Sequence, residues 1–111
     1  MMIKEGQAKK LTIYVDENDK IRGKPVYEVI IDLFYKEKIA GVSVFRGVAG
    51  YGGDGIFHTS KLLELSTSLP IKIEAIDSSV SIDNIMPKIS ELVKKGLIEV
   101  SDTFVVKSSS A

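Results

Sequence analysis

Two amphipathic stretches with helical spacing constrain the fold of this chain more than any other feature of the sequence. In the first, apolar residues recur every three or four positions behind Pro25, whose missing N–H is harmless in the first turn of a helix. The stripe consists of Val26, Val29, Ile30, Leu33 and Phe34. It predicts a helix over residues 25–39 that Gly41 terminates.

The second stretch has the same periodicity but contains a proline. Its stripe consists of Ile82, Ile85, Met86, Ile89, Leu92 and Val93. We expect Ser81 to be the N-cap of this helix and Gly96 to end it. Pro87 conflicts with a regular helix because it removes a backbone hydrogen bond, so either the first turn is irregular or the regular helix begins near Asn84.

Segments of alternating apolar and polar residues flank both helices, and this period of two indicates β-strands. The expected strands cover residues 11–15, 42–49, 71–77 and 97–107, with a bulge or bend at Asp102 in the last. Residues 16–23 are polar and predict a loop, and the leucine-rich residues 60–65 predict one or two helical turns. The order β-α-β-β-α-β predicts one domain over residues 1–111, with an ordered core of about 8–106.

This order is typical of a ferredoxin-like α+β fold, a four-stranded antiparallel sheet with both helices on one face. Alternation assigns a mixed set of residues to the other face: Thr12, Tyr14, Ser43, Phe45, Lys72, Glu74, Ile76 and Glu99. Such a face is too apolar for water and too polar for a core. We therefore expect another copy of the chain to cover it.

The composition excludes several kinds of site. The chain has no Cys and a single His, His58, so it can form neither a disulfide nor a two-His zinc site within one chain. Its 15 basic and 15 acidic side chains balance, without the basic excess of a nucleic-acid-binding domain. It shows no apolar run long enough to span a bilayer and no signal region at its start. We expect a cytoplasmic protein that binds no nucleic acid.

Five glycines stand within nine residues: Gly47, Gly50, Gly52, Gly53 and Gly55. Residues 50–55 match G-x-G-x-x-G, but they lie between the second and third expected strands rather than in the first βα turn of a dinucleotide-binding fold. Two interpretations remain open. The segment is a flexible hairpin loop, or its backbone amides form a cradle for phosphates.

Arg46 stands directly before this segment and is its natural charge partner. Alternation places it on the core-facing side, where an uncompensated guanidinium is costly. It therefore either binds an anion at the mouth of the loop or forms a salt bridge with Asp77 or Glu74. His58 and Lys61 are further candidates for contacting a ligand, and are otherwise ordinary surface residues.

Two other groups of side chains have both a functional and a structural interpretation. The rings of Tyr51 and Phe57 flank the glycines and either stack on a base or pack the loop. Asp16, Glu17 and Asp19 form an acidic loop, for which we favour solvation over cation binding because the calcium-loop spacing is absent. The sequence shows no nucleophile–base pair and no metal-ligand set, which predicts a binding protein without catalytic residues, metal or resident cofactor.

Three stretches resemble the PII-like proteins grouped as domain of unknown function 190. They read VFRGVAGYG at residues 44–52, IFHTSKLL at 56–63 and LPIKIEAID at 69–77. The resemblance covers about residues 8–106 and implies a PII-like trimer. In classical PII signalling proteins the loop between strands two and three contacts partner proteins, and adenine nucleotides bind between subunits near its base. This chain departs from that pattern in its shorter loop and in lacking a glycine-lysine loop after the second helix.

The resemblance and the residues together predict a PII-like regulatory or sensor protein. We expect a homotrimer that binds a small anionic ligand, with an adenine nucleotide as the candidate, at subunit interfaces near the glycine-rich loop 47–55. Loop 47–60 is the expected contact for a membrane-protein or enzyme partner. The alternatives are a protein-docking adaptor without a ligand and a nucleotide hydrolase that uses His58 at an interface. The candidate ligand-binding residues are Arg46, Gly47, Gly50, Gly52, Gly53, His58 and Lys61.

Overall fold

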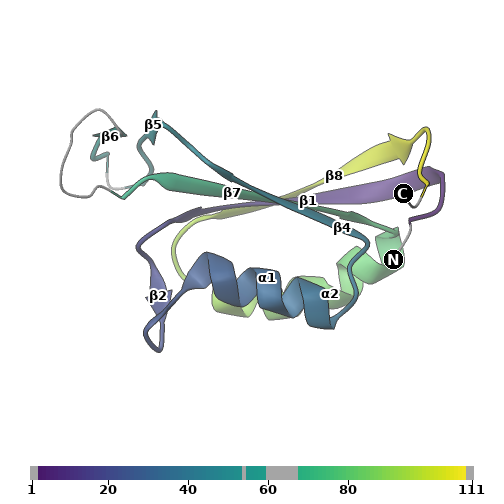
Figure 1. Cartoon of the computed structure of the whole chain (residues 1–111), viewed down its shortest axis with the longest axis horizontal. Coiled ribbons are helices and arrows are strands. Elements are labelled where there is room, and N and C mark those ends of the chain that lie inside the picture. Colours follow the sequence, from purple (N-terminus) through teal and green to yellow (C-terminus); the bar gives the residue numbers. More distant parts are fainter. Residues whose placement is uncertain (1–2, 54, 60–67, 110–111) are drawn as a thin grey trace.

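A four-stranded antiparallel sheet with both helices on one face forms the body of the protein (Figure 1). The computed structural model describes residues 3–53, 55–59 and 68–109, so the helical turns expected at 60–65 lie outside it. The sheet order is β4-β7-β1-β8. Its strands are β1 (Gly6–Asp16), β4 (Gly41–Arg46), β7 (Pro70–Asp77) and β8 (Leu97–Val105). The arrangement confirms the expected ferredoxin-like fold.

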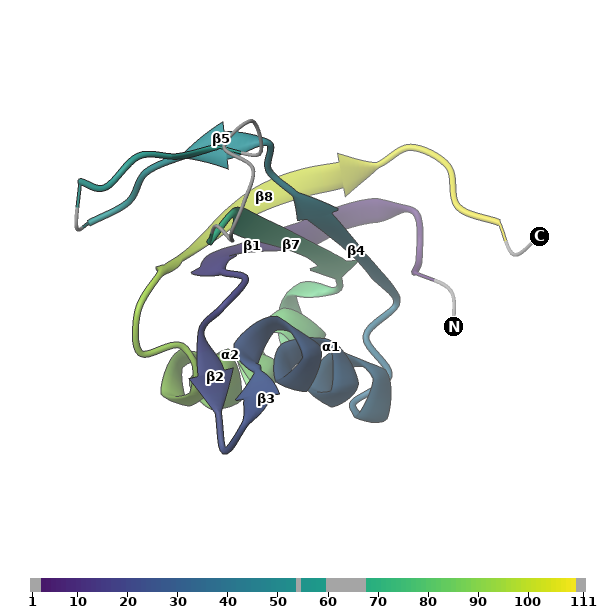
Figure 2. The same cartoon turned by 60° about the vertical axis from the view of Figure 1, so that its left-hand side comes forward.

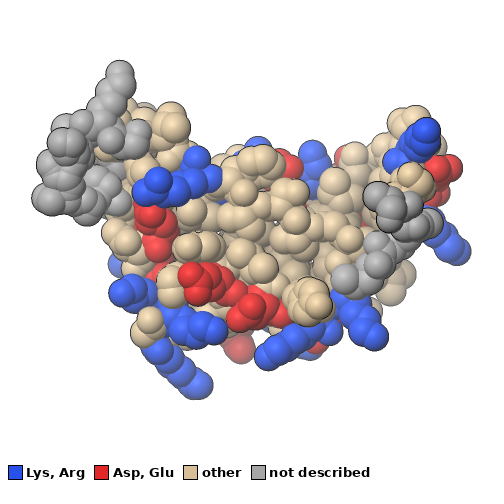
Figure 3. Space-filling view, in the orientation of Figure 1, with Lys and Arg blue, Asp and Glu red and all other residues tan. Residues whose placement is uncertain are grey.

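The core lies between the sheet and the helices α1 (Val26–Lys36) and α2 (Ser79–Leu92). Its fully buried side chains include Leu11 and Ile13 of β1, Ile30 and Phe34 of α1, and Ile82 and Ile89 of α2. These are the residues that the two periodicities select. Charged side chains gather along the helix layer, on the lower side of Figure 3.

Helix α1 ends at Lys36, three residues before the expected boundary. Gly41 does not end it, because Lys38 takes the left-handed conformation with a φ of 59° and turns the chain toward β4. The amide of Ile39 then donates to the carbonyl of Phe34 at 3.0 Å. The predicted stop at Gly41 is therefore wrong, and Gly41 is instead the first residue of β4.

The N-cap and the starting point predicted for helix α2 are both wrong. The cap is Ser78, whose hydroxyl accepts the Ser81 amide at 3.1 Å, so Ser81 lies inside the first turn. The helix runs regularly from Ser79 through Pro87, and neither alternative for its start holds. Pro87 and Asp83, whose carbonyl loses its donor, are both exposed. Water can therefore bind that carbonyl, which makes the proline tolerable.

Strand β8 pairs with β1 without interruption, from Gly6 opposite Val105 to Tyr14 opposite Leu97. The bulge or bend expected at Asp102 is absent, because Asp102 lies directly opposite Lys9 in a ladder that continues on both sides.

The predicted loop 16–23 contains part of a small hairpin, in which β2 (Lys20–Ile21) pairs with β3 (Lys24–Pro25). Arg22 and Gly23, with φ of 51° and 83°, form its two-residue turn. In the part of the chain that the structure describes, no helix combines the length and the apolar character needed to cross a bilayer.

Candidate functional site

The face of the sheet away from the helices carries the mixed residues that alternation assigned to it. One row across the four strands consists of Phe45, Lys72, Tyr14 and Leu97. The next row consists of Ser43, Glu74, Thr12 and Glu99. We call this surface the open face. Phe45 and Leu97 are about half exposed, at 50% and 52%, so the open face presents large apolar side chains to its surroundings.

Lys72 and Glu74 form an ion pair on the open face, with 2.9 Å between Nζ and Oε2. The hydrogen bond to Glu74 raises the pKa of Lys72, and the same hydrogen bond lowers the pKa of Glu74. The ammonium group of Lys72 also lies 5.7 Å from the centroid of the Phe45 ring, within cation–π range.

The glycine segment, residues 47–59, leaves the sheet as a narrow ribbon. Strand β4 ends at Arg46 rather than at residue 49, and β5 (Ala49–Gly50) pairs with β6 (His58–Thr59). The rings of Tyr51 and Phe57 face each other beyond this pairing, with centroids 6.2 Å apart. The two rings contact each other while both remain mostly exposed, so packing of the loop and stacking on a base both stay open. Figure 2 shows β5 beyond the end of the sheet, on the side away from the helices.

Gly47 lies tightly against Pro70 at the base of the ribbon. Its amide donates to the Pro70 carbonyl at 2.7 Å, and a Cβ at this position would lie 2.7 Å from the Pro70 Cγ. The absence of a side chain at Gly47 therefore serves a close contact with another part of the chain itself.

Arg46 binds Glu17, which follows β1. Its Nε donates to both carboxylate oxygens at 3.2 and 3.1 Å, and its Nη2 donates to Oε1 at 3.0 Å. These hydrogen bonds raise the pKa of Arg46, to which the nearby Tyr27 of α1 also contributes. The side chain therefore lies on the helix side of the sheet, in line with its register partner Ile71 in the core.

The salt bridge expected between Arg46 and either Asp77 or Glu74 is wrong in its partner. Asp77 accepts the Ala40 amide at 2.9 Å instead, and Glu74 is paired with Lys72. Arg46 lies opposite Ile71, at the end of β7 far from Asp77, and Glu17 follows β1 at that same end. The Glu17 carboxylate also accepts the amide of the buried Leu69 at 3.1 Å. One carboxylate thereby ties the ends of β1 and β4 to the residue before β7.

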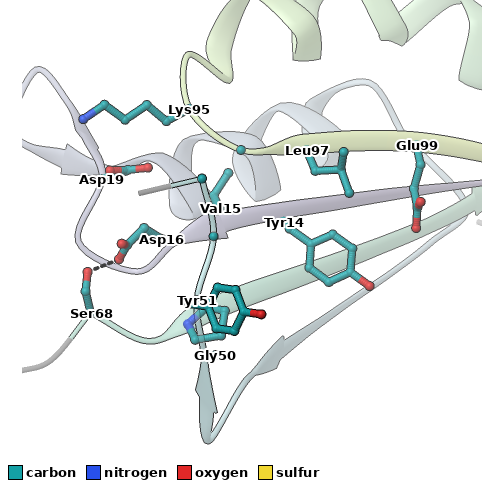
Figure 4. Close-up of a pocket in the computed structure, with 14 residues that line it drawn as sticks. Tyr14, Val15, Asp16, Asp19, Gly50, Tyr51, Ser68, Lys95, Leu97 and Glu99 are labelled. Atoms are coloured by element: carbon teal, nitrogen blue, oxygen red, sulfur yellow. Dashed lines mark hydrogen bonds between the residues drawn. The ribbon is translucent and has the colours of Figure 1, made fainter. Parts of the chain in front are cut away.

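An open groove of about 1120 Å³ lies between the glycine segment and the end of the sheet (Figure 4). The open face contributes Tyr14, Leu97 and Glu99 to its lining, and the glycine segment contributes Gly50, Tyr51, Gly52 and Gly53. The remaining lining residues are Val15, Asp16, Asp19, Ser68, Pro70, Lys95 and Gly96. Gly96 is required here, because its φ is 141° and a Cβ would collide with the Tyr14 carbonyl oxygen.

The acidic loop contributes two of these lining residues. Asp16 accepts the Asn18 amide at 3.2 Å and the Ser68 hydroxyl, which fixes its carboxylate at the groove edge. Asp16 and Glu17 are thus held by protein groups rather than solvated as expected. Among the described lining residues, three carboxylates face one ammonium group, that of Lys95.

The structure brings only some of the candidate ligand-binding residues to the groove. Gly50, Gly52 and Gly53 line it, whereas Arg46 and Gly47 lie outside its lining. His58 is paired with Gly50 through the ribbon, and Lys61 lies outside the described residues. No sequence motif marks Tyr14, Lys95 and Leu97 as site residues. Alternation placed Tyr14 on the open face, but a local pattern cannot show that the glycine segment lies beside that face.

The sequence model of the DUF190 family, described as uncharacterized ACR (COG1993), matches residues 8–105. The chain belongs to the DUF190 family. This DUF190 protein is 37% identical over 102 residues to a UPF0166 protein of Methanocaldococcus jannaschii, covering 91% of this chain and 94% of the relative. It is 33% identical over 98 residues to a UPF0166 protein of Aquifex aeolicus, covering 88% of this chain and 92% of the relative.

The DUF190 protein also matches solved structures of CPII, a nitrogen regulatory PII-like protein from Thiomonas intermedia K12. The structure bound to ADP, AMP and bicarbonate matches with a TM-score of 0.63 and 21% identity, over 95% of this chain and 93% of that one. The structure bound to ADP, AMP and acetate matches with a TM-score of 0.66 and 18% identity, over 95% of this chain and 94% of that one. The likeness shows a PII-like fold, as the sequence resemblance implied.

Proposed function

We propose that this protein is a PII-like regulatory binding protein, not an enzyme, and that it binds a small anionic ligand in the groove beside the glycine segment. An adenine nucleotide is the first candidate. The observation that carries the proposal is the groove itself, in which a glycine-rich backbone faces the aromatic rings of Tyr14 and Tyr51. The ADP and AMP bound to CPII, a protein of the same fold, support this choice of ligand.

The groove has the size and chemistry of a small-molecule site. Its volume of about 1120 Å³ is sufficient for a nucleotide. Tyr51 is 71% exposed and presents a flat ring on which a base can stack. Gly52 and Gly53 carry no Cβ and the space beside each is open, so an anion can approach the backbone closely there.

We further propose a homotrimer in which the open faces turn inward. The half-exposed Phe45 and Leu97 support it, because burying them against another copy removes apolar surface from water. Tyr14 and Leu97 belong both to the open face and to the groove lining, so a neighbouring subunit would stand at the border of the groove. Sedimentation equilibrium at micromolar concentration tests this, and a stable 12.2 kDa monomer would contradict it.

Thermal denaturation with and without ligand tests the binding function. A ligand at 100 times its dissociation constant adds about 2.7 kcal/mol to the folded state, which raises Tm by several degrees. We expect such a rise with at least one of AMP, ADP and ATP. Tyr51→Ala should abolish it, whereas Tyr35→Ala, an equally exposed tyrosine on α1, should preserve it. Failure of every adenine nucleotide to raise Tm would refute the proposal.

A protein-docking adaptor without a ligand is the second candidate. Four apolar side chains of the glycine segment favour it, because each is more than half exposed: Val48, Tyr51, Ile56 and Phe57. The two candidates differ in the melting experiment, since an adaptor shows no ligand-dependent rise. The hydrolase alternative predicts repeated phosphate release from ATP and magnesium that His58→Ala abolishes. Binding without turnover would exclude it.

A further inference from the structure

We infer that the groove holds the nucleoside end of its ligand and selects against additional phosphates. The inference rests on the proposed function, because it concerns the ligand of the same groove. Among the adenine nucleotides it predicts that AMP is preferred over ADP and ATP, and uncharged adenosine is the reference compound for the titrations.

The charges of the groove oppose a polyphosphate. The described lining carries Asp16, Asp19 and Glu99 against the single ammonium of Lys95, whereas phosphate sites usually present several cationic groups or a helix N-terminus. Arg46 cannot reverse this balance. Its guanidinium is paired with Glu17 and is not among the residues that line the groove. Each further phosphate charge therefore enters an increasingly unfavourable potential.

The same lining suits a nucleoside. The rings of Tyr14 and Tyr51 and the side chain of Leu97 provide apolar surface for a base, and Figure 4 shows all three at the groove. Carboxylates accept hydrogen bonds from ribose hydroxyls and from an exocyclic amine. The Oδ1 of Asp16 already accepts from the Ser68 hydroxyl and the Asn18 amide, which anchors that carboxylate to the protein. Glu99 and Asp19 are therefore the carboxylates that we assign to the ligand's neutral donors.

Isothermal titration of the intact protein with adenosine, AMP, ADP and ATP tests the inference, in EDTA at low and high NaCl. We expect adenosine or AMP to bind more tightly than ATP. Salt screens repulsion between the carboxylates and the phosphates, so high NaCl should strengthen ATP binding relative to adenosine. A site dominated by cationic side chains would show the opposite salt dependence.

Three variants test which carboxylates cause the selection against additional phosphates. Glu99→Gln and Asp19→Asn remove one negative charge each from the groove, and each should shift the ratio of ATP to adenosine affinity toward ATP by roughly threefold to tenfold. Glu91→Gln makes the same change in charge on the exposed surface of α2 and should leave the ratio unchanged.

The outcomes separate this inference from the proposed function. If none of the four compounds binds, both are wrong. If they bind but ATP binds most tightly and weakens with salt, adenine-nucleotide binding stands and selection against phosphates is overturned. An affinity ratio that responds to Glu99→Gln and Asp19→Asn no more than to Glu91→Gln would also overturn the selection.

Discussion

The carboxylate of Glu17 holds the guanidinium of Arg46 at the point where β4 passes into the glycine segment, with 3.0 Å between Oε1 and Nη2. The same carboxylate accepts the amide of Leu69, a buried residue. An arginine that was a candidate ligand-binding residue thus forms part of a junction between three chain segments. Its position favours the structural interpretation over the anion anchor.

This junction gives a first prediction. We expect Arg46→Gln to lower the stability of the fold while leaving ligand affinity in the groove nearly unchanged. Glu17→Ala should be more destabilising, because it also leaves the Leu69 amide without its acceptor, at a cost of about 1–3 kcal/mol. Urea denaturation and ligand titration of both variants check this. If Arg46→Gln keeps full stability but loses ligand binding, Arg46 is the anion anchor after all.

The contact between Gly47 and Pro70 gives a second prediction. In Gly47→Ala the new methyl group would lie 2.7 Å from the Pro70 Cγ, so the ribbon or the start of β7 must shift. Overpacking of this kind costs about 1–3 kcal/mol. Gly52→Ala is the matched control, because a Cβ there meets nothing within 4 Å. Equal denaturation midpoints for the two variants would show that the contact with Pro70 does not constrain the ribbon.

The sequence predicted what depends on local periodicity. Alternation assigned Thr12 and Tyr14 to the open face, which leaves their neighbours Leu11 and Ile13 for the core, because strand alternation is a property of neighbouring residues. The N-cap of α2 was misassigned because Ser78, Ser79 and Ser81 are equivalent as capping residues in a local pattern. Only the end of β7 at Asp77 shows that the helix begins after Ser78.

The site was less predictable because it depends on distant pairings. Glu17 and Arg46 lie 29 residues apart; Glu17 follows β1 and Arg46 ends β4, two strands that are not adjacent in the sheet. Their ion pair therefore requires the register of β7 against both neighbours. The groove likewise requires Tyr14, Gly50 and Leu97 to converge, and no spacing in the sequence reports that convergence.

The Lys72–Glu74 pair gives a pH-dependent prediction. The folded-state pKa of Glu74 is lowered, so its contribution to stability is full above the ordinary value of 4.5 and is lost as pH falls through the folded value. The folded-state pKa of Lys72 is raised, so its contribution is full below 10.5 and is lost as pH rises through the folded value. Glu74→Gln should therefore be less stable than the natural protein at neutral pH and equally stable in acid.

Thermal denaturation of both proteins across this pH range measures the difference. The pair is partly exposed, so the difference should be small and should shrink in high salt. If the stability difference between the two proteins persists unchanged below the folded-state pKa of Glu74, it arises from packing rather than from the ion pair.

Pro87 gives a prediction of increased stability. Pro87→Ala restores a backbone donor for the exposed carbonyl of Asp83 and replaces the residue least suited to a helix interior with the best one. We expect an increase of about 1–3 kcal/mol, partly offset by the greater freedom of the unfolded chain. Ser90→Ala, also exposed on α2, is the control for propensity alone. An increase no larger than that of the control would mean that the proline does not strain the helix.

The open face gives a prediction about assembly. Phe45 is half exposed in one chain, and the proposed trimer buries it against neighbouring copies. In Phe45→Glu the new carboxylates would lie buried between subunits, which is costly, so the trimer should dissociate. The single chain should remain folded, because position 45 tolerates solvent and Lys72 lies near enough to pair with the carboxylate.

Tyr35→Glu introduces the same charge on α1, at a side chain that is 76% exposed, and should leave the assembly intact. Sedimentation and circular dichroism of both variants decide the matter. If Phe45→Glu sediments with Tyr35→Glu and the natural protein, the open face is not the surface that joins the subunits.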